Sequence, residues 1–133
     1  MTLTLRNDIQ DVPLLAAFID EVCEAAGFNP SVTMQMNLAM EEAVVNVMNY
    51  AYPKGVLGDI VIEAEISGDS VRFVIIDGGT PFDPTVEADA DTTLSVEERP
   101  IGGLGIFLVR QLMDVISYEY SDGKNKLTLV KNK

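Results

Sequence analysis

One hairpin pattern constrains the fold of this chain more than any other feature of its sequence. Residues 59–67 (DIVIEAEIS) and 70–77 (SVRFVIID) alternate apolar and polar side chains, and Gly68-Asp69 between them is a strong turn signal. Alternation gives each strand one apolar face, so the hairpin predicts a sheet whose one side is covered by other elements.

The remaining patterns supply that cover and extend the sheet. In chain order they predict a strand at residues 2–6, a helix at 8–26 that stops at Gly27, a helix capped by Asn29 that reaches about Tyr50, the hairpin, a helix at 104–113, and a closing hairpin of residues 115–121 and 126–133 turned at Asp122-Gly123. The first helix is expected to bury a stripe made of Leu14, Leu15, Phe18, Ile19 and Val22. This order predicts one α+β domain over residues 1–133, a two-layer sandwich with helices on one face of a mixed, mainly antiparallel sheet.

Composition excludes several classes of function. The net charge of −12 repels phosphate backbones and anionic lipid heads, which argues against binding to nucleic acid or to a membrane surface. The chain has no histidine, which excludes sites built on histidine ligands, and the lone Cys23 cannot form an internal disulfide. No apolar run approaches the roughly 20 residues that span a bilayer, and no signal-peptide pattern opens the chain, so we expect a cytoplasmic protein.

The second helix carries the most informative polar residue. Asn46 interrupts an apolar run, AVV-N-VM, and Glu42 lies one turn before it on the same face, with Asn49 close to the same line. A buried amide without partners costs about 1–3 kcal/mol, so something must satisfy it. Two explanations are open: a hydrogen bond to a neighbouring loop, or an amide oxygen that binds a hard cation such as Mg²⁺.

Two glycine-containing segments follow. Asp77 ends an apolar strand and could accept a hydrogen bond from an exocyclic amino group, while Gly78 and Gly79 permit positive φ and the close approach of a flat ring. The sequence Gly102-Gly103-Leu104-Gly105 opens a helix and would expose backbone N–H groups to an anion. A plain turn and a flexible helix start remain alternatives, because this cluster matches neither a Walker A loop nor a Rossmann fingerprint.

The order of the three segments is more specific than any one of them. Glu-x-x-x-Asn on a helix, Asp-x-Gly after a strand and Gly-x-Gly at a helix start resemble the gyrase, heat-shock chaperone, histidine kinase and MutL ATPase superfamily. The stretches EEAVVNVMNYAYP, DGGTPFDP and ERPIGGLGIFLVRQLMD resemble, within it, the small bacterial anti-sigma factor serine kinases. The resemblance covers nearly the whole chain and implies a Bergerat ATP-binding fold with ATP and Mg²⁺ as cofactors.

The resemblance also implies residue roles. Asn46 would coordinate Mg²⁺, Glu42 would orient or deprotonate the attacking hydroxyl, and Asp77 would bind the adenine amino group above a floor shaped by Gly79. Residues 80–101 would form a lid over the nucleotide. The full nucleotide-binding set implied in this way is Asn46, Asn49, Asp77, Gly79, Phe82, Gly102, Gly103, Leu104 and Gly105.

By the same resemblance, the substrate is a serine of an anti-anti-sigma protein, a sigma factor is the sequestered partner, and the kinase is a homodimer. The superfamily often has a threonine on a late strand that supports the adenine-binding aspartate, and here Asn125 and Thr128 are the two candidates. Pro81 stands where a further glycine is common. Two other functions stay open: a non-catalytic, ATP-gated binding module, and a scaffold with a structural Asn46 that binds no nucleotide.

Overall fold

A computed structural model describes residues 1–53, 55–86 and 103–133 of the chain. Most of the expected lid and Gly102 therefore lie outside the described residues. The elements are, in order, β1 (Thr2–Arg6), η1 (Ile9–Asp11), α1 (Val12–Ala26), α2 (Pro30–Tyr50), β2 (Asp59–Ile66), β3 (Ser70–Asp77), η2 (Pro84–Val86), α3 (Gly103–Leu112), β4 (Val115–Ser121) and β5 (Lys124–Asn132).

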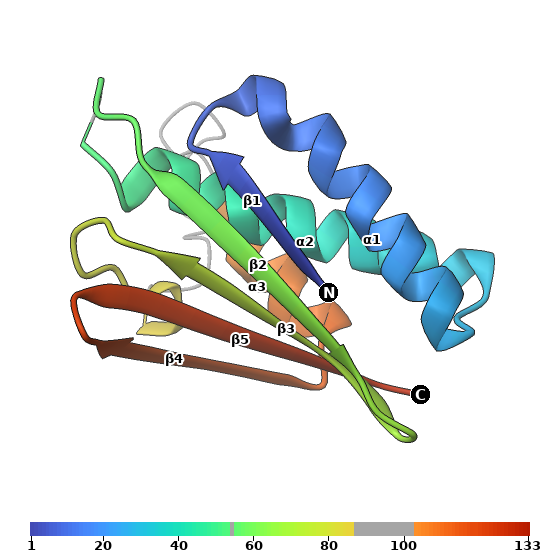
Figure 1. The fold of residues 1–133 in the computed structure, drawn as a ribbon. Coiled ribbons are helices and arrows are strands. Elements are labelled where there is room, and N and C mark those ends of the chain that lie inside the picture. Colours follow the sequence, from blue (N-terminus) through green and yellow to red (C-terminus); the bar gives the residue numbers. More distant parts are fainter. Residues whose placement is uncertain (54, 87–102) are drawn as a thin grey trace.

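The five strands form one sheet in the order β1-β2-β3-β5-β4, and helices α1, α2 and α3 lie against one of its faces (Figure 1). This confirms the predicted two-layer α+β architecture. All four strand pairings are antiparallel, so the described sheet is antiparallel where the sequence predicted a mixed one. None of the described helices is both long and apolar enough to cross a membrane.

The core lies between the sheet and the helices. Strand β3 shows how alternation in the sequence decides which side chains enter the core. Val71, Phe73 and Ile75 are buried, whereas Arg72 is exposed. Full burial of a side chain such as Phe73 contributes about 1.5–3 kcal/mol. The period-two pattern therefore orients the hairpin, and the helices bury its apolar face.

Helix boundaries follow local chemistry. The Asn29 side chain caps α2 by accepting a hydrogen bond from the Val32 N–H at 2.8 Å, and Gly27 ends α1 in the left-handed conformation. The predicted start of the first helix at Asp8 is wrong, because a short 3₁₀ turn at Ile9–Asp11 precedes α1. The assignment of Leu14 to the buried stripe is also wrong, since Leu14 is 54% exposed.

Two features of the sheet place the candidate site. The closing turn at Asp122 and Gly123 has φ values of 55° and 75°, as in a tight turn between two antiparallel strands, and it sets the register of β5 against β4. On its other side β5 pairs with β3, and there Asn125 lies opposite Asp77, the last residue of β3. The end of β3 and the start of β5 therefore bring these two polar side chains together.

Candidate functional site

Asp77 is the centre of a buried polar cluster at the end of β3. The side chain is 3% exposed, and its Oδ1 accepts hydrogen bonds from the Gly79 N–H and from the Asn125 Nδ2, each at 2.9 Å. Burial raises the pKa of the Asp77 carboxyl, although these two hydrogen bonds act in the opposite direction. Within the described part of the chain, Oδ2 has no hydrogen bond, so one carboxylate oxygen is held and the other is available to a ligand.

Asn125 is the residue that supports Asp77, which decides between the two candidates that the sequence offered. Asn125 is 3% exposed and points to the helix-covered side of the sheet. Thr128 pairs with Val74 farther along the strand, and neither of these is fully buried. The period of two along β5 therefore places Thr128 on the opposite face from Asn125.

Gly79 is required by a close approach between the turn after β3 and the end of α2. A Cβ atom at Gly79 would lie 2.2 Å from the carbonyl oxygen of Ala51, which is too close for any other residue without backbone movement. Gly78 and Gly79 do not adopt the positive φ that glycine permits, because the described glycines with positive φ are Gly27, Gly55 and Gly123. Glycine is needed here for space and not for an unusual backbone conformation.

Thr80 completes the joint between this turn and α2. Its backbone N–H and its Oγ1 both donate to the Ala51 carbonyl oxygen, at 2.7 and 3.0 Å. The carbonyl groups at the end of a helix have no partner within the helix. Here Thr80 supplies two donors to the carbonyl of Ala51, the residue that follows the last residue of α2. The helix that carries Asn46 and the turn that carries Asp77 are thus directly bonded.

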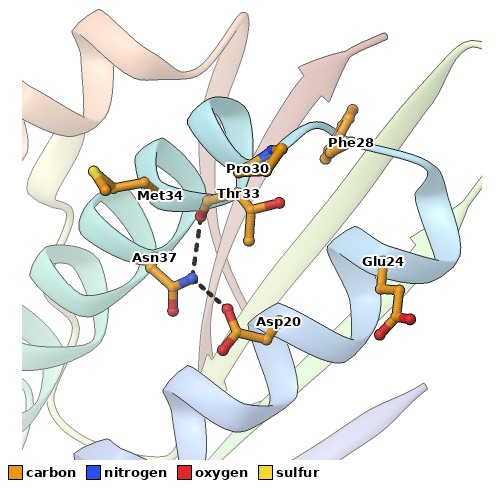
Figure 2. A pocket seen from close by; sticks show the side chains of 7 residues that line it. All are labelled: Asp20, Glu24, Phe28, Pro30, Thr33, Met34 and Asn37. Atoms are coloured by element: carbon orange, nitrogen blue, oxygen red, sulfur yellow. Dashed lines mark hydrogen bonds between the residues drawn. The ribbon is translucent and has the colours of Figure 1, made fainter.

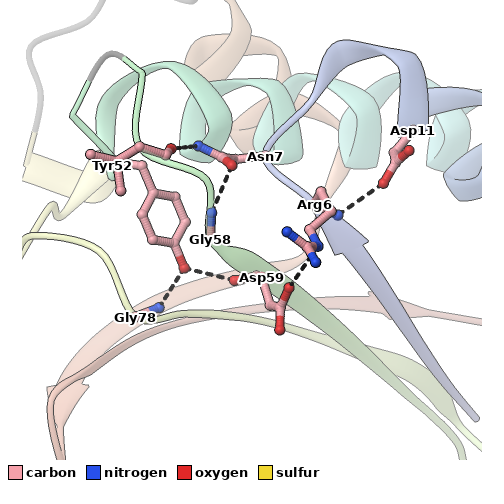
Figure 3. A network of polar contacts seen from close by, with 8 residues as sticks. Arg6, Asn7, Asp11, Tyr52, Gly58, Asp59 and Gly78 are labelled. Atoms are coloured by element: carbon pink, nitrogen blue, oxygen red, sulfur yellow. Dashed lines mark hydrogen bonds and ion pairs between the residues drawn. The ribbon is translucent and has the colours of Figure 1, made fainter.

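Tyr52 is a second link that the sequence reasoning missed. Its hydroxyl donates to the Asp59 carbonyl oxygen at 2.7 Å and accepts from the Gly78 N–H at 2.9 Å (Figure 3). Its ring lies against Gly58, where a Cβ atom would lie 2.2 Å from the ring. Burial raises the pKa of the Tyr52 hydroxyl, so it remains a donor at neutral pH. The signal available in the sequence was the pairing of an aromatic residue after the helix with Gly58 before the strand.

Asn7, directly after β1, binds the segment between α2 and β2. Its side chain donates to the Val56 carbonyl oxygen at 2.7 Å and accepts from the Gly58 N–H at 2.8 Å. Figure 3 shows that this network joins the end of β1, the segment after α2 and the turn after β3. The scaffold around the candidate site is therefore fixed from three elements.

The other half of the site lies on α2. Asn46 is 4% exposed and its side chain makes no hydrogen bond with the described residues, so it is an orphaned buried amide. Glu42, one turn earlier, is half-buried, whereas Glu41 is exposed. The described residues contain no group of three Asp, Glu or Cys side chains that could hold a metal ion. An Mg²⁺ ion beside Asn46 would therefore take most of its oxygen ligands from phosphates and water.

The remaining predicted residues fall into three groups. Phe82 joins the Asp77 cluster, because its N–H donates to the Asn125 Oδ1 at 3.0 Å and its ring stacks on that of Tyr50 with centroids 5.6 Å apart. Asn49 is exposed and lines a pocket of about 630 Å³ that does not include Asp77 or Asn125 but borders their cluster through Tyr50 and Tyr52. Gly103, Leu104 and Gly105 form the first turn of α3, which confirms the predicted helix start.

A second hollow, of about 510 Å³, lies between α1 and α2 and contains none of the predicted site residues (Figure 2). There the Asn37 Nδ2 donates to the Asp20 Oδ1 at 2.8 Å and to the Thr33 carbonyl oxygen at 3.1 Å. The bond to Asp20 ties α2 to α1, whereas the bond to Thr33 lies within α2, and the hollow is separate from the Asp77 cluster.

Comparison with known proteins identifies the family of the fold. Residues 5–131 match the model of the histidine kinase-like ATPase domain. The serine-protein kinase RsbW of Listeria monocytogenes is 29% identical over 127 residues, which cover 92% of this chain and 81% of that protein. The serine/threonine-protein kinase BtrW of Bordetella bronchiseptica is 31% identical over 94 residues, covering 71% of this chain and 66% of that protein.

A solved structure shares the fold. The RsbU and RsbW domains of Rv1364c from Mycobacterium tuberculosis align with a TM-score of 0.67 at 20% identity, over 98% of this chain and 32% of that one. This chain thus spans about a third of that longer crystallised chain. The family match extends from β1 to β5 and includes every element around Asp77, Asn46 and the start of α3. The chain therefore belongs to the histidine kinase-like ATPase domain family.

Proposed function

We propose that this chain is an ATP- and Mg²⁺-dependent protein serine kinase that phosphorylates an anti-anti-sigma protein and, in its other state, holds a sigma factor. One observation carries the nucleotide part of this proposal: the orphaned amide of Asn46, buried in an apolar helix that is bonded through Ala51 to the turn after Asp77. A structural Asn46 would have a hydrogen-bond partner. The names of the similar kinases support the rest.

On the adenine side, the free Oδ2 of Asp77 would accept a hydrogen bond from the exocyclic amino group, and the Gly79 backbone would let the ring approach closely. On the phosphate side, Gly103 and Gly105 stand in the first turn of α3, where N–H groups without helical partners favour an anion. The amide oxygen of Asn46 would bind Mg²⁺. The ion, when bound, neutralises part of the phosphate charge.

In the proposed reaction, Glu42 holds the serine hydroxyl of the substrate and accepts its proton. The serine oxygen forms a bond to the γ-phosphorus while the bond from that phosphorus to the β-phosphate oxygen breaks, and ADP leaves. General-base assistance of this kind contributes about 10²–10⁴-fold. The remainder comes from positioning and charge neutralisation, as is general for phosphoryl transfer.

The test uses γ-labelled ATP, Mg²⁺ and a small antagonist-like protein encoded beside the gene for this chain. We expect label on a serine of that protein, and transfer slower by about 10²–10⁴-fold when Glu42→Gln replaces the wild type. Glu41→Gln is the matched control, since Glu41 is the adjacent exposed carboxylate on α2. Tight ATP binding without transfer by the wild type would overturn the kinase proposal in favour of a non-catalytic, ATP-gated binding module.

The proposal extends to assembly and location. We propose a homodimer in the cytoplasm, with the sigma factor released when the unphosphorylated antagonist binds. Sedimentation of the wild-type chain at micromolar concentration tests the first part. A single species at the monomer mass of 14.5 kDa would contradict it.

A further inference from the structure

We infer that Arg110 is a positioning residue that ties α3, which carries the proposed phosphate-binding turn, to the segment that follows the adenine side of the site. This inference rests on the proposed nucleotide site and deepens it, because it names a contact that sets the spacing between the two sides. The Arg110 side chain is not required to touch the nucleotide or the reacting atoms.

Arg110 stands in the last turn of α3 and is half-buried. A cation in the last turn is favourable for any helix, so this place in the helix alone assigns no role. The contact of the guanidinium does assign one, because its Nη2 donates to the carbonyl oxygen of Thr85 in η2, 25 residues earlier in the chain. A guanidinium is charged at neutral pH, and a charge-assisted hydrogen bond is stronger than a bond between neutral groups.

The acceptor of this bond is held in place by the turn around it. The Asp83 Oδ1 accepts hydrogen bonds from the Thr85 N–H at 2.8 Å and from the Thr85 Oγ1 at 2.5 Å, and Pro84 between the two residues is buried. The same short turn, η2, also packs against β4. The Thr85 carbonyl therefore has a fixed direction in which it meets Arg110.

The segment that holds Thr85 is bound to the adenine side three residues earlier. The Phe82 N–H donates to the Asn125 Oδ1 at 3.0 Å, and the Phe82 ring stacks on that of Tyr50 with centroids 5.6 Å apart. Residues 82–85 thus contact β5 and α2 at one end and α3 at the other. Through Arg110, this short run of chain connects the two sides of the site.

Under the proposed function, the spacing between the two sides matters only to a ligand that reaches both. Gly103, at the start of α3, lies seven residues before Arg110, which is about 10 Å along the helix axis. ATP would place its base at Asp77 and its phosphates at the start of α3. Once one end is bound, the binding of the other end depends on how firmly α3 is held. Adenosine would use the adenine side alone, so loss of the Arg110 contact should weaken ATP binding selectively.

Methionine and lysine at position 110 separate the contact from the bulk of the side chain. Both have a long unbranched stem and are good helix formers, so α3 should persist in either variant. Methionine has no donor, whereas lysine keeps a charged donor without the planar fork of arginine. Arg72→Met is the matched control, because the Arg72 side chain is exposed on β3 and pairs with Glu65 at 2.6 Å.

The experiment measures the affinity for ATP with Mg²⁺ by calorimetry and the affinity for adenosine by competition. We expect Arg110→Met to weaken ATP binding by about 10-fold, the size of one charge-assisted hydrogen bond, and adenosine binding by less than about twofold. Arg110→Lys should fall between Arg110→Met and the wild type. Arg72→Met should change neither affinity by more than about twofold.

Two further measurements distinguish positioning from a general loss of structure. Urea denaturation without nucleotide gives the folded fraction of Arg110→Met under the conditions of the binding assay, and a fraction near that of the wild type leaves the loss of ATP affinity to the contact. Thr85→Val removes the hydroxyl donor to Asp83 with little change of shape and so loosens the carbonyl that Arg110 binds. This variant should weaken ATP binding by about two- to fivefold and leave adenosine binding unchanged.

The outcomes separate this inference from the proposed function. A wild type that binds no ATP would end the proposed function itself. A wild type that binds ATP, together with a folded Arg110→Met variant of equal ATP affinity, would overturn the role of Arg110 alone, as would equal losses of ATP and adenosine affinity. If Arg110→Met does not fold, Thr85→Val with an unchanged ATP affinity gives the same negative result.

Discussion

The two halves of the candidate site differ in how the protein treats its buried polar groups. Around Asp77, the Oδ1 and all four hydrogen-bonding positions of Asn125 are taken up by other described residues. On α2, the equally buried Asn46 has no partner among them. The first half is built in advance of any ligand, whereas the second leaves a polar group for a ligand to satisfy. Under the proposed function, the adenine-binding half is preformed and the phosphate-binding half is completed by the nucleotide.

The largest effect should appear at Glu42, which belongs to the incomplete half. Glu42→Gln removes the proposed general base without changing the size of the side chain, so phosphoryl transfer should fall by about 10²–10⁴-fold. The affinity for ATP should stay within about threefold of the wild type, because the Asp77 half is untouched. Single-turnover transfer and equilibrium binding, measured side by side, test this separation, and equal transfer rates would show that Glu42 has another role.

The next effect concerns the joint between the halves. Gly79→Ala would force a Cβ atom against the Ala51 carbonyl oxygen, and we expect it to lower the free energy of unfolding by about 1–3 kcal/mol and to weaken ATP binding. Gly78→Ala is the matched control, since its Cβ would lie 3.9 Å from the nearest atom, the Tyr52 hydroxyl. Urea denaturation of both variants checks the prediction, which fails if the two lose the same stability.

A direct comparison of the two amides comes third. Asn46→Leu removes an amide without a partner and places a better helix former in α2, so the free energy of unfolding should rise by about 1 kcal/mol while Mg²⁺-dependent ATP binding is lost. Asn125→Leu leaves Asp77 without its donor and should lower the same quantity by about 1–3 kcal/mol. A loss of stability in both variants would remove the distinction between the halves.

The smallest effect is a dependence on pH. Since burial raises the pKa of Asp77, the folded protein binds more protons at this carboxyl than the unfolded chain does at pH values between the ordinary and the raised pKa. Stability should therefore fall as the pH rises through that window. Asp77→Asn keeps an acceptor for Asn125 but has no carboxyl to titrate, so its stability should not show this decrease with rising pH. The variant should therefore have a higher melting temperature than the wild type at pH 7 and much weaker ATP binding. Thermal melts of both proteins from pH 4 to pH 7 measure it, with the exposed turn variant Asp69→Asn as control.

The sequence predicted the architecture well because its signals are local. The hairpin at residues 59–77 followed from alternation, and the start of α2 followed from the Asn29-Pro30 pair. Leu14 was assigned to the core wrongly, because helical period alone cannot decide where the edge of a buried stripe lies.

The site was predictable only in part. Asp77, Asn46 and the glycines at the start of α3 were found from motif order, and their roles in binding remain predictions. The role of the Ala51 carbonyl and the choice of Asn125 over Thr128 were not predictable, because each depends on which strand and which face a residue meets across the fold. The sequence singled out Gly79. The reason that glycine is needed there, the close contact with Ala51, could be seen only once α2 was packed against the turn.

The bond from Thr80 to Ala51 makes one backbone amide a reporter for the whole site. The Thr80 N–H is held at 2.7 Å by a carbonyl at the end of α2, so it can exchange with deuterium only when that end of the helix and the turn after β3 separate. Hydrogen exchange at this amide would then slow when a bound nucleotide stabilises the contact between α2 and the turn. It would become faster when a bound partner destabilises that contact, so the exchange rate of one amide reports on both kinds of binding.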